Sequence, residues 1–470
     1  MSDPFIFEDC KDKRCDGKTL PRLLCAIEEL RKAIRDGTVE ILSLSGRRHA
    51  DARELPEMIT YEVTGRSLIK TWDTVSSVII HASHYIGCYS TWVQVEGRSP
   101  ESGETVTIEI KSRWGKDILN YLLQYTSGIY LPPDSSAGSK ATPDSAEWML
   151  VLLWRSVFHQ ALRRSHIPKE YRKKRTNDRY FSGQLDVARQ IRENIADQSR
   201  FCCVYSPLTM DTTINQTIRY VTRLLRRNHY YAMLLNDIAV YDERLAAFGV
   251  KARDLLPAEV DHIRYTRMSE GYRPLMQISK AIIRRFGAAT SLSASGQPSF
   301  FVDISEIWEN YLHAILTKHL PAPYRVINPN NSGGQWLITG ERREIRPDLI
   351  IENQNSVPVA IIDAKFKYYT AIGKFARDGV SREDLYQMTT YLYHYGQIDV
   401  PLLGLFVCPG EGDKNLHQLE KHRHHTIGVL NFDLDQWDKK EDKFDKCAIN
   451  VYEEKFVTKL TAKLKEIAGS

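Results

Sequence analysis

Long hydrophobic runs are missing from this sequence. No apolar stretch approaches the roughly 20 residues that a helix needs to cross a bilayer. The first residues, MSDPFIFEDCKDKR, alternate acidic and basic side chains and lack the apolar core of a secretory leader. These absences argue against a membrane-spanning or secreted protein, and we expect a cytoplasmic one.

The sequence also lacks the cysteine spacings that are typical of disulfide frameworks and zinc sites, and it lacks nucleotide-binding motifs. The chain of 470 residues has eight cysteines and no Cys-x-x-Cys pair, which excludes a disulfide framework of the secreted kind. Cys10, Cys15 and Cys25 are loosely clustered, and we expect reduced thiols there, with a zinc site as the alternative. The phosphate-binding patterns GxxxxGKS and GxxxxGKT are also absent, so the chain is not expected to hydrolyse a nucleotide by itself.

Composition and two interruptions indicate the domain organisation. Hydrophobic residues make up 42% and charged residues 26% of the chain, which is ordinary for a globular protein, and its length allows two or three domains. Segments rich in Pro, Ser and Gly at 131–145 and 291–299 separate three parts. We predict a β-containing N-terminal region (1–135) that binds a partner or senses DNA, a mainly helical middle region (146–292) and an α/β domain (300–470).

The last part mixes the helical and strand periods. Helices are predicted at 303–320, with Asp303 or Ser305 near its cap, and at 382–396. Strands are predicted at 335–340, 346–353, 357–367, 401–409 and 426–434. A helix, three strands, a helix and two strands in this order predict an α/β sandwich with a central mixed sheet.

Three charged residues interrupt two of these apolar strands. Asp348 opens one strand, and Asp363 and Lys365 end the next. Side chains alternate along a strand, so Asp363 and Lys365 point the same way. A charge that leaves water costs several kcal/mol unless it is paired or binds a metal. If the strands are neighbours, both carboxylates and the ammonium converge at one edge of the sheet.

This combination suits phosphodiester hydrolysis. Two converging carboxylates suit a hard divalent cation, Mg²⁺ above all, which activates water and polarises the phosphate. A neighbouring lysine then stabilises the negative charge of the transition state. The alternative is structural: Asp363 and Lys365 form an ion pair, and Asp348 caps a turn.

The spacing of these residues resembles that of the PD-(D/E)xK nucleases. A Pro-Asp pair ends at Asp348, and Asp363-Ala-Lys365 follows fifteen residues on. The next predicted helix carries Gln387 and Tyr391, which resemble the QxxxY element that follows the catalytic strand in RecB-like members. The alternatives are a solvated position for Gln387 and a core aromatic for Tyr391.

Residues 180–225 resemble McrC, the nuclease subunit of the McrBC modification-dependent restriction systems. The matching elements are a Gly-Gln-Leu-Asp turn at 183–186 and the Asp211…Asn215 pair that opens a helix. FFVDISEIWENYL (300–312), the two charged strands and the Gln387 helix then follow in the family's order. The resemblance covers roughly residues 104–435, while the first hundred residues have no match.

The resemblance implies a Mg²⁺-dependent endodeoxyribonuclease that acts in phage or foreign DNA restriction with an AAA+ GTPase ring. It implies Asp348, Asp363 and Lys365 as the catalytic set, with both aspartates binding Mg²⁺ (Mn²⁺ possible as a substitute) and Gln387 assisting. Glu309 is expected at the family's acidic position on the first nuclease helix, and Glu306 is its rival. A non-catalytic adaptor that activates the GTPase and a stand-alone restriction nuclease are the alternatives.

Basic residues gather in the middle region. Seven Lys or Arg stand against one Glu in 163–175: Arg163, Arg164, Lys169, Arg172, Lys173, Lys174 and Arg175. With Arg223, Arg226 and Arg227 they are candidates for a phosphate-binding face. A solvated helix end and a contact to an acidic partner are the alternatives. KHRHH at 421–425 is expected to be an exposed loop, since histidine ligands suit zinc better than magnesium.

Overall fold

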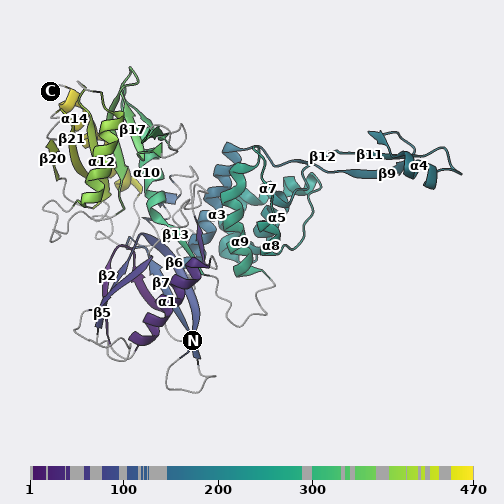
Figure 1. Cartoon of the computed structure of the whole chain (residues 1–470), viewed down its shortest axis with the longest axis horizontal. Helices are drawn as coiled ribbons and strands as arrows, with labels where there is room; N and C mark the ends of the chain where they lie inside the picture. The colour runs from purple at the N-terminus through teal and green to yellow at the C-terminus, as the bar shows by residue number, and fades with distance from the viewer. Residues whose placement is uncertain are drawn as a thin grey trace. The chain divides into compact units, whose positions relative to one another are not determined.

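The fold comes from a computed structural model (Figure 1). It describes residues 4–16, 19–36, 39–42, 58–63, 77–94, 103–114, 118–119, 121–123, 125, 145–287, 299–329, 334–338, 344–366, 380–397, 400–410, 414–418, 424–432 and 446–468. No helix within these ranges is both long and apolar enough to cross a membrane.

Two compact units make up the chain. The first combines Met1–Ala146 with Ser299–Ser470, and the second is Glu147–Pro298. Both ends of the chain therefore belong to one unit. The segments that we predicted as linkers lie almost entirely outside the described residues. Helices and sheets occur together, so the protein has a mixed α/β fold.

The N-terminal part of the first unit contains two sheets and a helix. One sheet has the strand order β1-β7-β6-β13-β3, and the other has the order β2-β5-β4. The strands are β1 (Phe5–Glu8), β2 (Asp12–Asp16), β3 (Glu40–Leu42), β4 (Ile59–Val63), β5 (Ser77–Ala82), β6 (Tyr85–Gln94), β7 (Gly103–Lys111) and β13 (Phe300–Asp303). Helix α1 (Leu20–Arg35) buries one apolar face, including Leu24 and Ile27, against this part's core. Runs of strand-forming residues at 75–83, 90–97 and 105–112 predict β5, β6 and β7, but α1 was not predicted.

Strand β13 ties the two parts of the first unit together. It pairs antiparallel with β6 and parallel with β3, although it lies more than 200 residues further along the chain than either strand. Gly87 makes this approach possible, because a Cβ atom there would lie 2.1 Å from the Phe300 carbonyl oxygen. Helix α10 (Ile304–His319) follows at once, and the Asp303 side chain caps it by accepting from the Ser305 N–H at 2.9 Å.

The C-terminal part of this unit is built on a six-stranded sheet of order β14-β17-β18-β19-β21-β20. Its strands are β14 (Arg325–Ile327), β17 (Leu349–Glu352), β18 (Pro358–Ala364), β19 (Leu403–Pro409), β20 (Lys414–Gln418) and β21 (Thr426–Phe432). Strands β17 and β18 are antiparallel, whereas β18, β19 and β21 run parallel. The predicted central mixed sheet is therefore present.

Helices cover both faces of this sheet. Helix α12 (Arg382–Tyr395) packs Met388 and Leu392 on one face, in a cluster with Phe406. On the other face, α10 and α14 (Lys446–Ala468) contact Phe432 through the rings of Trp308 and Phe456. The resulting three layers bury the end of β18, where the charged residues of the motif lie.

The predicted strand at 335–340 is wrong as a member of this sheet. Residues Gln335–Trp336 form β15, which pairs only with β16 (Glu344–Ile345) in a two-stranded ribbon. Trp336, Leu337 and Ile338 are exposed, so their apolar run marks surface rather than core. Sequence analysis also missed β14, β20 and α14.

The second unit contains a helical bundle. Its helices are α3 (Ser145–Arg164), α5 (Thr213–Leu225), α6 (His229–Leu234), α7 (Asn236–Ala247), α8 (Pro257–Asp261) and α9 (Arg273–Phe286). The buried Trp154 indole donates to the Ser279 hydroxyl at 2.8 Å, and Phe158 packs edge-on against Tyr241. Apolar residues recur every three or four positions in 147–165 and 215–238, which predicts a helix in each segment. Both helices are confirmed, and the second is divided among α5, α6 and α7.

A slender arm, residues 170–209, extends from this bundle (Figure 1). It consists of β8 (Glu170–Tyr171), β9 (Lys174–Asp178), β10 (Gln184–Leu185), α4 (Val187–Glu193), β11 (Phe201–Tyr205) and β12 (Leu208–Thr209). Strand β11 pairs antiparallel with both β9 and β10. Sequence analysis did not predict this arm, because its strands are short and rich in charged residues.

Candidate active site

The register of β17 and β18 brings two carboxylates together. Leu349 pairs with Ile362, so the preceding residue, Asp348, lies opposite Asp363. The Asp348 carboxylate accepts a hydrogen bond from the Ala364 N–H at 2.7 Å. Asp348 therefore bonds across to the neighbouring strand rather than capping a turn, and the predicted convergence at one edge is present.

The Asp348 carboxylate lies in an environment that disfavours its ionised form. Asp363 is only 3% exposed. Burial, followed by the charges of Asp363 and Glu309 and a hydrogen bond with Asp363, raises the pKa of Asp348 well above its ordinary range. The Ala364 N–H opposes this shift. Two carboxyl groups this close resist ionising together unless a proton or a cation lies between them.

Helix α10 distinguishes the two acidic candidates. The Glu309 charge acts on Asp348, whereas the Glu306 charge contributes to the raised pKa of Tyr85, after burial and the charge of Asp303. The charge of Glu309 is thus associated with the candidate site, and the charge of Glu306 with Tyr85 of the N-terminal sheet. The structure thus groups Glu309, rather than its rival, with the two aspartates.

Lys365 stands beside Asp363 with its ammonium surrounded by acceptors. Its Nζ atom lies 2.9 Å from an Asp363 oxygen and 3.6 Å from an Asp384 oxygen, and it donates to the Gln387 side-chain oxygen at 3.0 Å. Burial lowers its pKa, but Asp363, Asp384 and Asp348 outweigh burial, so the pKa of Lys365 is raised. The side chain carries a positive charge at neutral pH.

Helix α12 supplies three polar side chains to the site from one face. Asp384, Gln387 and Tyr391 lie three and four residues apart, the spacing of neighbours on a helix. Gln387 donates to the Tyr391 hydroxyl at 2.8 Å, and that hydroxyl donates to the Arg346 carbonyl at 3.3 Å. Gln387 is exposed, as its alternative had it, but it is also bonded to Lys365 and Tyr391. Tyr391 is a buried core aromatic, and its hydroxyl links the helix to the chain entering β17.

Asp384 is the site residue that sequence analysis missed. The Ser381 hydroxyl donates to its carboxylate at 2.7 Å and caps the helix by accepting from the Asp384 N–H at 3.2 Å. Asp384 is 7% exposed, a burial that a helix-capping role alone does not require. Its position one turn before Gln387 was the signal that could have found it.

The donor set at Asp348 and Asp363 fits Mg²⁺. No group of three or more His, Cys, Asp or Glu side chains that could enclose a metal occurs among the described residues. Mg²⁺ does not need such a cage, because it is commonly held by one or two carboxylates and keeps several waters. The raised pKa of Asp348 indicates a pair that a cation would stabilise.

The predicted basic face is divided among several elements. Arg163 and Arg164 are exposed at the end of α3, Lys169 precedes β8, and Lys173, Lys174 and Arg175 are exposed on the arm. Arg172 bonds to Glu170 and Asp211, and Arg223 pairs with Asp254. Arg226 and Arg227 are exposed at the end of α5.

The Asp211…Asn215 motif holds the root of the arm. Asp211 accepts from Arg172 at 3.2 Å and from the Gln216 amide at 2.6 Å. Asn215 donates to the carbonyls of Pro168 and Met210, which lie on either side of the root. These bonds fix both sides of the arm's root to the start of α5. Asp211 and Asn215, which carried part of the resemblance, therefore have a structural role here.

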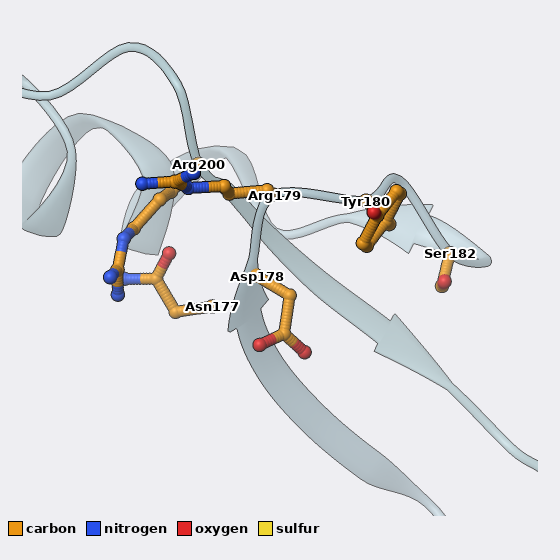
Figure 2. A pocket seen from close by; sticks show the side chains of 6 residues that line it. All are labelled: Asn177, Asp178, Arg179, Tyr180, Ser182 and Arg200. Atoms are coloured by element: carbon orange, nitrogen blue, oxygen red, sulfur yellow. The ribbon is translucent and has the colours of Figure 1, made fainter.

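The tip of the arm is exposed and carries an open pocket of about 450 Å³ (Figure 2). Asn177, Asp178, Arg179, Tyr180, Ser182 and Arg200 line it. Gly183, at φ +75°, lets the chain turn beside Tyr205. Large apolar side chains of the arm face solvent: Tyr171, Tyr180, Phe181, Val187, Ile191, Ile195 and Leu208.

The expectation of an exposed loop at 421–425 is wrong for His425. Residues 421–423 lie outside the described residues, but His425 is 3% exposed. Its ring stacks edge-on against His424 and lies against Gly396, where a Cβ atom would approach the ring nitrogen to 2.7 Å. His425 immediately precedes the buried strand β21, and burial next to this strand overrides the basic character of the run.

Comparisons with known proteins identify the family. Residues 80–403 match the family described as McrBC 5-methylcytosine restriction system component. The fold is similar to a chain in a refined half-complex from the tetradecameric assembly of Thermococcus gammatolerans McrB AAA+ hexamers with bound McrC. That match has 18% identity and a TM-score of 0.50, and covers 98% of this chain and 100% of that one.

A second similar structure is the cryo-EM structure of the Thermococcus gammatolerans McrBC complex. It matches with 18% identity and a TM-score of 0.33, over 68% of this chain and 88% of that chain. No curated protein sequence matches the chain. The family match extends over more than half of the sequence, and the chain therefore belongs to the McrBC 5-methylcytosine restriction system component family.

Proposed function

We propose that this protein is the McrC-like endonuclease subunit of an McrBC-type system and cleaves modified DNA by Mg²⁺-dependent phosphodiester hydrolysis. The observation that carries the proposal is the convergence of Asp348, Asp363 and Lys365 at one end of β17 and β18. The mixed sheet, covered on both faces, and the Gln387–Tyr391 pair support a nuclease core of the PD-(D/E)xK type.

Asp348 and Asp363 are the residues that would hold Mg²⁺, or Mn²⁺ in its place. The bound ion would polarise the phosphate and lower the pKa of a water nucleophile. Glu309 adds negative charge beside Asp348, as its effect on the pKa of Asp348 indicates. Glu309 is thus proposed to contribute charge near the two aspartates and not to bind the ion.

Lys365 stabilises the charge that develops on the phosphate oxygens. Gln387 holds the ammonium in place through its 3.0 Å bond, and Tyr391 in turn orients the Gln387 amide. Because Asp363 and Asp384 keep the pKa of Lys365 raised, the side chain acts as a cation rather than as a general base. An ion pair between Asp363 and Lys365 also fits the structural alternative, so activity must decide between the two.

The proposed partner is an AAA+ GTPase ring in the cytoplasm. The fold match to a chain from a complex of McrB AAA+ hexamers with McrC supports this proposal. The exposed apolar side chains of the arm give the second unit a surface of the kind that protein partners cover. The exposed basic residues at 163–164, 169 and 173–175 are proposed to contact DNA phosphates.

A plasmid-cleavage assay tests the proposal. It uses methylated and unmethylated DNA, and omits in turn Mg²⁺, GTP and the AAA+ protein encoded alongside. We expect cutting of methylated DNA only when all three are present. Cutting by the chain alone at specific sites would indicate a stand-alone nuclease, and GTPase stimulation without any cutting would indicate an adaptor.

A further inference from the structure

The residue after Lys365 is anchored in the N-terminal part of the unit. Phe366 is 4% exposed and, by strand alternation, points away from the face that carries Asp363 and Lys365. Its ring centroid lies 4.6 Å from that of Trp114, edge-on, and 4.9 Å from the Arg113 guanidinium. Its carbonyl oxygen accepts a hydrogen bond from the Cys10 thiol at 3.2 Å.

Arg113 and Asp9 form a buried charged pair behind this anchor. The side chains are 1% and 0% exposed. The Arg113 N–H donates to an Asp9 oxygen at 2.6 Å, Nε lies 3.9 Å from the other oxygen, and the guanidinium lies 4.7 Å from the Trp114 ring. A buried ion pair contributes little to stability compared with well-packed hydrocarbon. We therefore look for a role of this pair in positioning its neighbours.

The backbone at Cys10 is held in an unusual conformation. Its φ of 52° is in the left-handed region, which costs a non-glycine residue roughly 1–2 kcal/mol. Hydrogen bonds from the Asp9 N–H to the Lys111 carbonyl and from the Cys10 N–H to the Ser83 carbonyl keep it there. This conformation is the one in which the thiol reaches Phe366. Strain of this kind persists where the surroundings determine it closely.

The same cluster contacts helix α10. Trp114 lies 6.4 Å, between ring centroids, from Trp308, which precedes Glu309. The Trp308 indole donates to the Val407 carbonyl at 3.2 Å, and the Lys365 N–H donates to that same carbonyl at 3.0 Å. The Val407 carbonyl therefore positions both Trp308 and Lys365, and Trp114 packs against Trp308 and against Phe366, the residue after Lys365.

We propose that Arg113, whose guanidinium packs on the rings of Phe366 and Trp114, is a positioning residue that holds these two rings and thereby sets Lys365 for phosphodiester cleavage. The N-terminal part, which has no motif of its own, would then be part of the cleavage apparatus. This inference rests on the proposed nuclease function. A planar cation between two rings and a carboxylate fixes orientation in a way that an aliphatic side chain does not.

The experiment compares Arg113→Met with Arg155→Met. Arg155 is a matched control: its side chain is 8% exposed and pairs with Asp237, but it belongs to the second unit. With the AAA+ partner and GTP present, Arg113→Met should lower kcat by roughly 10- to 100-fold, with KM for DNA changed less than about threefold. Amide hydrogen exchange over residues 358–366 should accelerate in Arg113→Met only.

The milder variant Phe366→Leu serves if Arg113→Met does not fold. It keeps an apolar side chain but removes the ring, and kcat should fall by roughly 5- to 10-fold. Wild-type-like kcat and exchange in either variant would overturn the inference. If wild type does not cut, the nuclease proposal fails, and the exchange comparison still decides whether Arg113 fixes the end of β18.

Discussion

The candidate active site and the arm depart from the usual burial pattern in opposite directions. At the end of β18 the structure buries Asp363 and Asp384 where hydrocarbon would be expected. On the arm it exposes Tyr180 by 82% and Ile195 by 75%. Buried charge indicates chemistry or ligand binding, and exposed apolar surface indicates a partner. The proposed function thus assigns cleavage to the first unit and docking of the partner to the second.

The largest expected effect is on the cleavage rate and comes from a residue of the buried charged site. Replacing Lys365 with Met should lower the cleavage rate by roughly 10²- to 10³-fold, because the transition-state charge loses its cation. GTPase stimulation of the partner should not change. Lys280→Met is the control, since Lys280 is 19% exposed against 20% for Lys365 and pairs with Asp261 at 2.7 Å. Equal cleavage by the two variants would remove Lys365 from the mechanism.

The second prediction concerns Asp9, a buried carboxyl whose contribution to stability should depend on pH. Burial, opposed by Arg113, raises the pKa of Asp9 from 3.8 to about 6. The folded state therefore binds this proton more tightly, and the stability that Asp9 contributes below pH 3.8 is lost as pH rises through 6. Asp9→Asn, which does not titrate, should gain about 2 kcal/mol relative to wild type between pH 4 and pH 7.

Urea unfolding of both proteins at the two pH values measures this gain for Asp9. A stability difference that stays constant with pH would mean that Asp9 is not a buried, raised carboxyl. Asp9 would then no longer be an example of a buried charge in the first unit.

The arm offers the complementary test. Replacing both Tyr180 and Ile195 with Ser should weaken binding of the AAA+ partner by about 30-fold, because anchors of this size dominate interface energy. Thermal stability should hold, since both side chains already face solvent. Met268→Ser, 69% exposed but outside the arm, is the control. Partner affinity measured by calorimetry that is equal in all three proteins would refute a docking role for the arm.

The smallest expected effect is on kcat and concerns Asp384, the site residue that belongs to no predicted motif. Asp384→Asn should lower kcat by about tenfold, or roughly 1.4 kcal/mol, because the Lys365 ammonium loses an anionic neighbour at 3.6 Å. Ser381→Ala removes the cap of the same helix but leaves the carboxylate, so it should affect stability more than rate. The reverse order of rates would assign Asp384 to capping alone.

Sequence reasoning located the candidate site because strand periodicity is local. Two strands in neighbouring order suffice to bring Asp348 and Asp363 together, and a helical spacing suffices for Gln387 and Tyr391. Whether those residues are catalytic stays a prediction. The histidine at 425 was misjudged because composition alone does not give burial.

Several features could not be predicted because they depend on contacts between residues that are far apart in the sequence. The pairing of β13 with β6, the Phe366 anchor on Trp114 and the pair of Asp9 with Arg113 join residues about 100 or more positions apart. The arm escaped prediction for another reason: β9 reads Lys-Arg-Thr-Asn-Asp and has no apolar alternation. Its order comes from pairing with β11 and from the bonds at its root.

The most direct test of the account compares wild type with Asp363→Ala, each with Mg²⁺, GTP and the AAA+ partner, in one reaction that follows both DNA cutting and GTP turnover. The account predicts that Asp363→Ala stimulates GTP turnover like wild type but cuts no DNA. Cutting at the wild-type rate by Asp363→Ala would contradict it and leave the buried charges of β18 as structural.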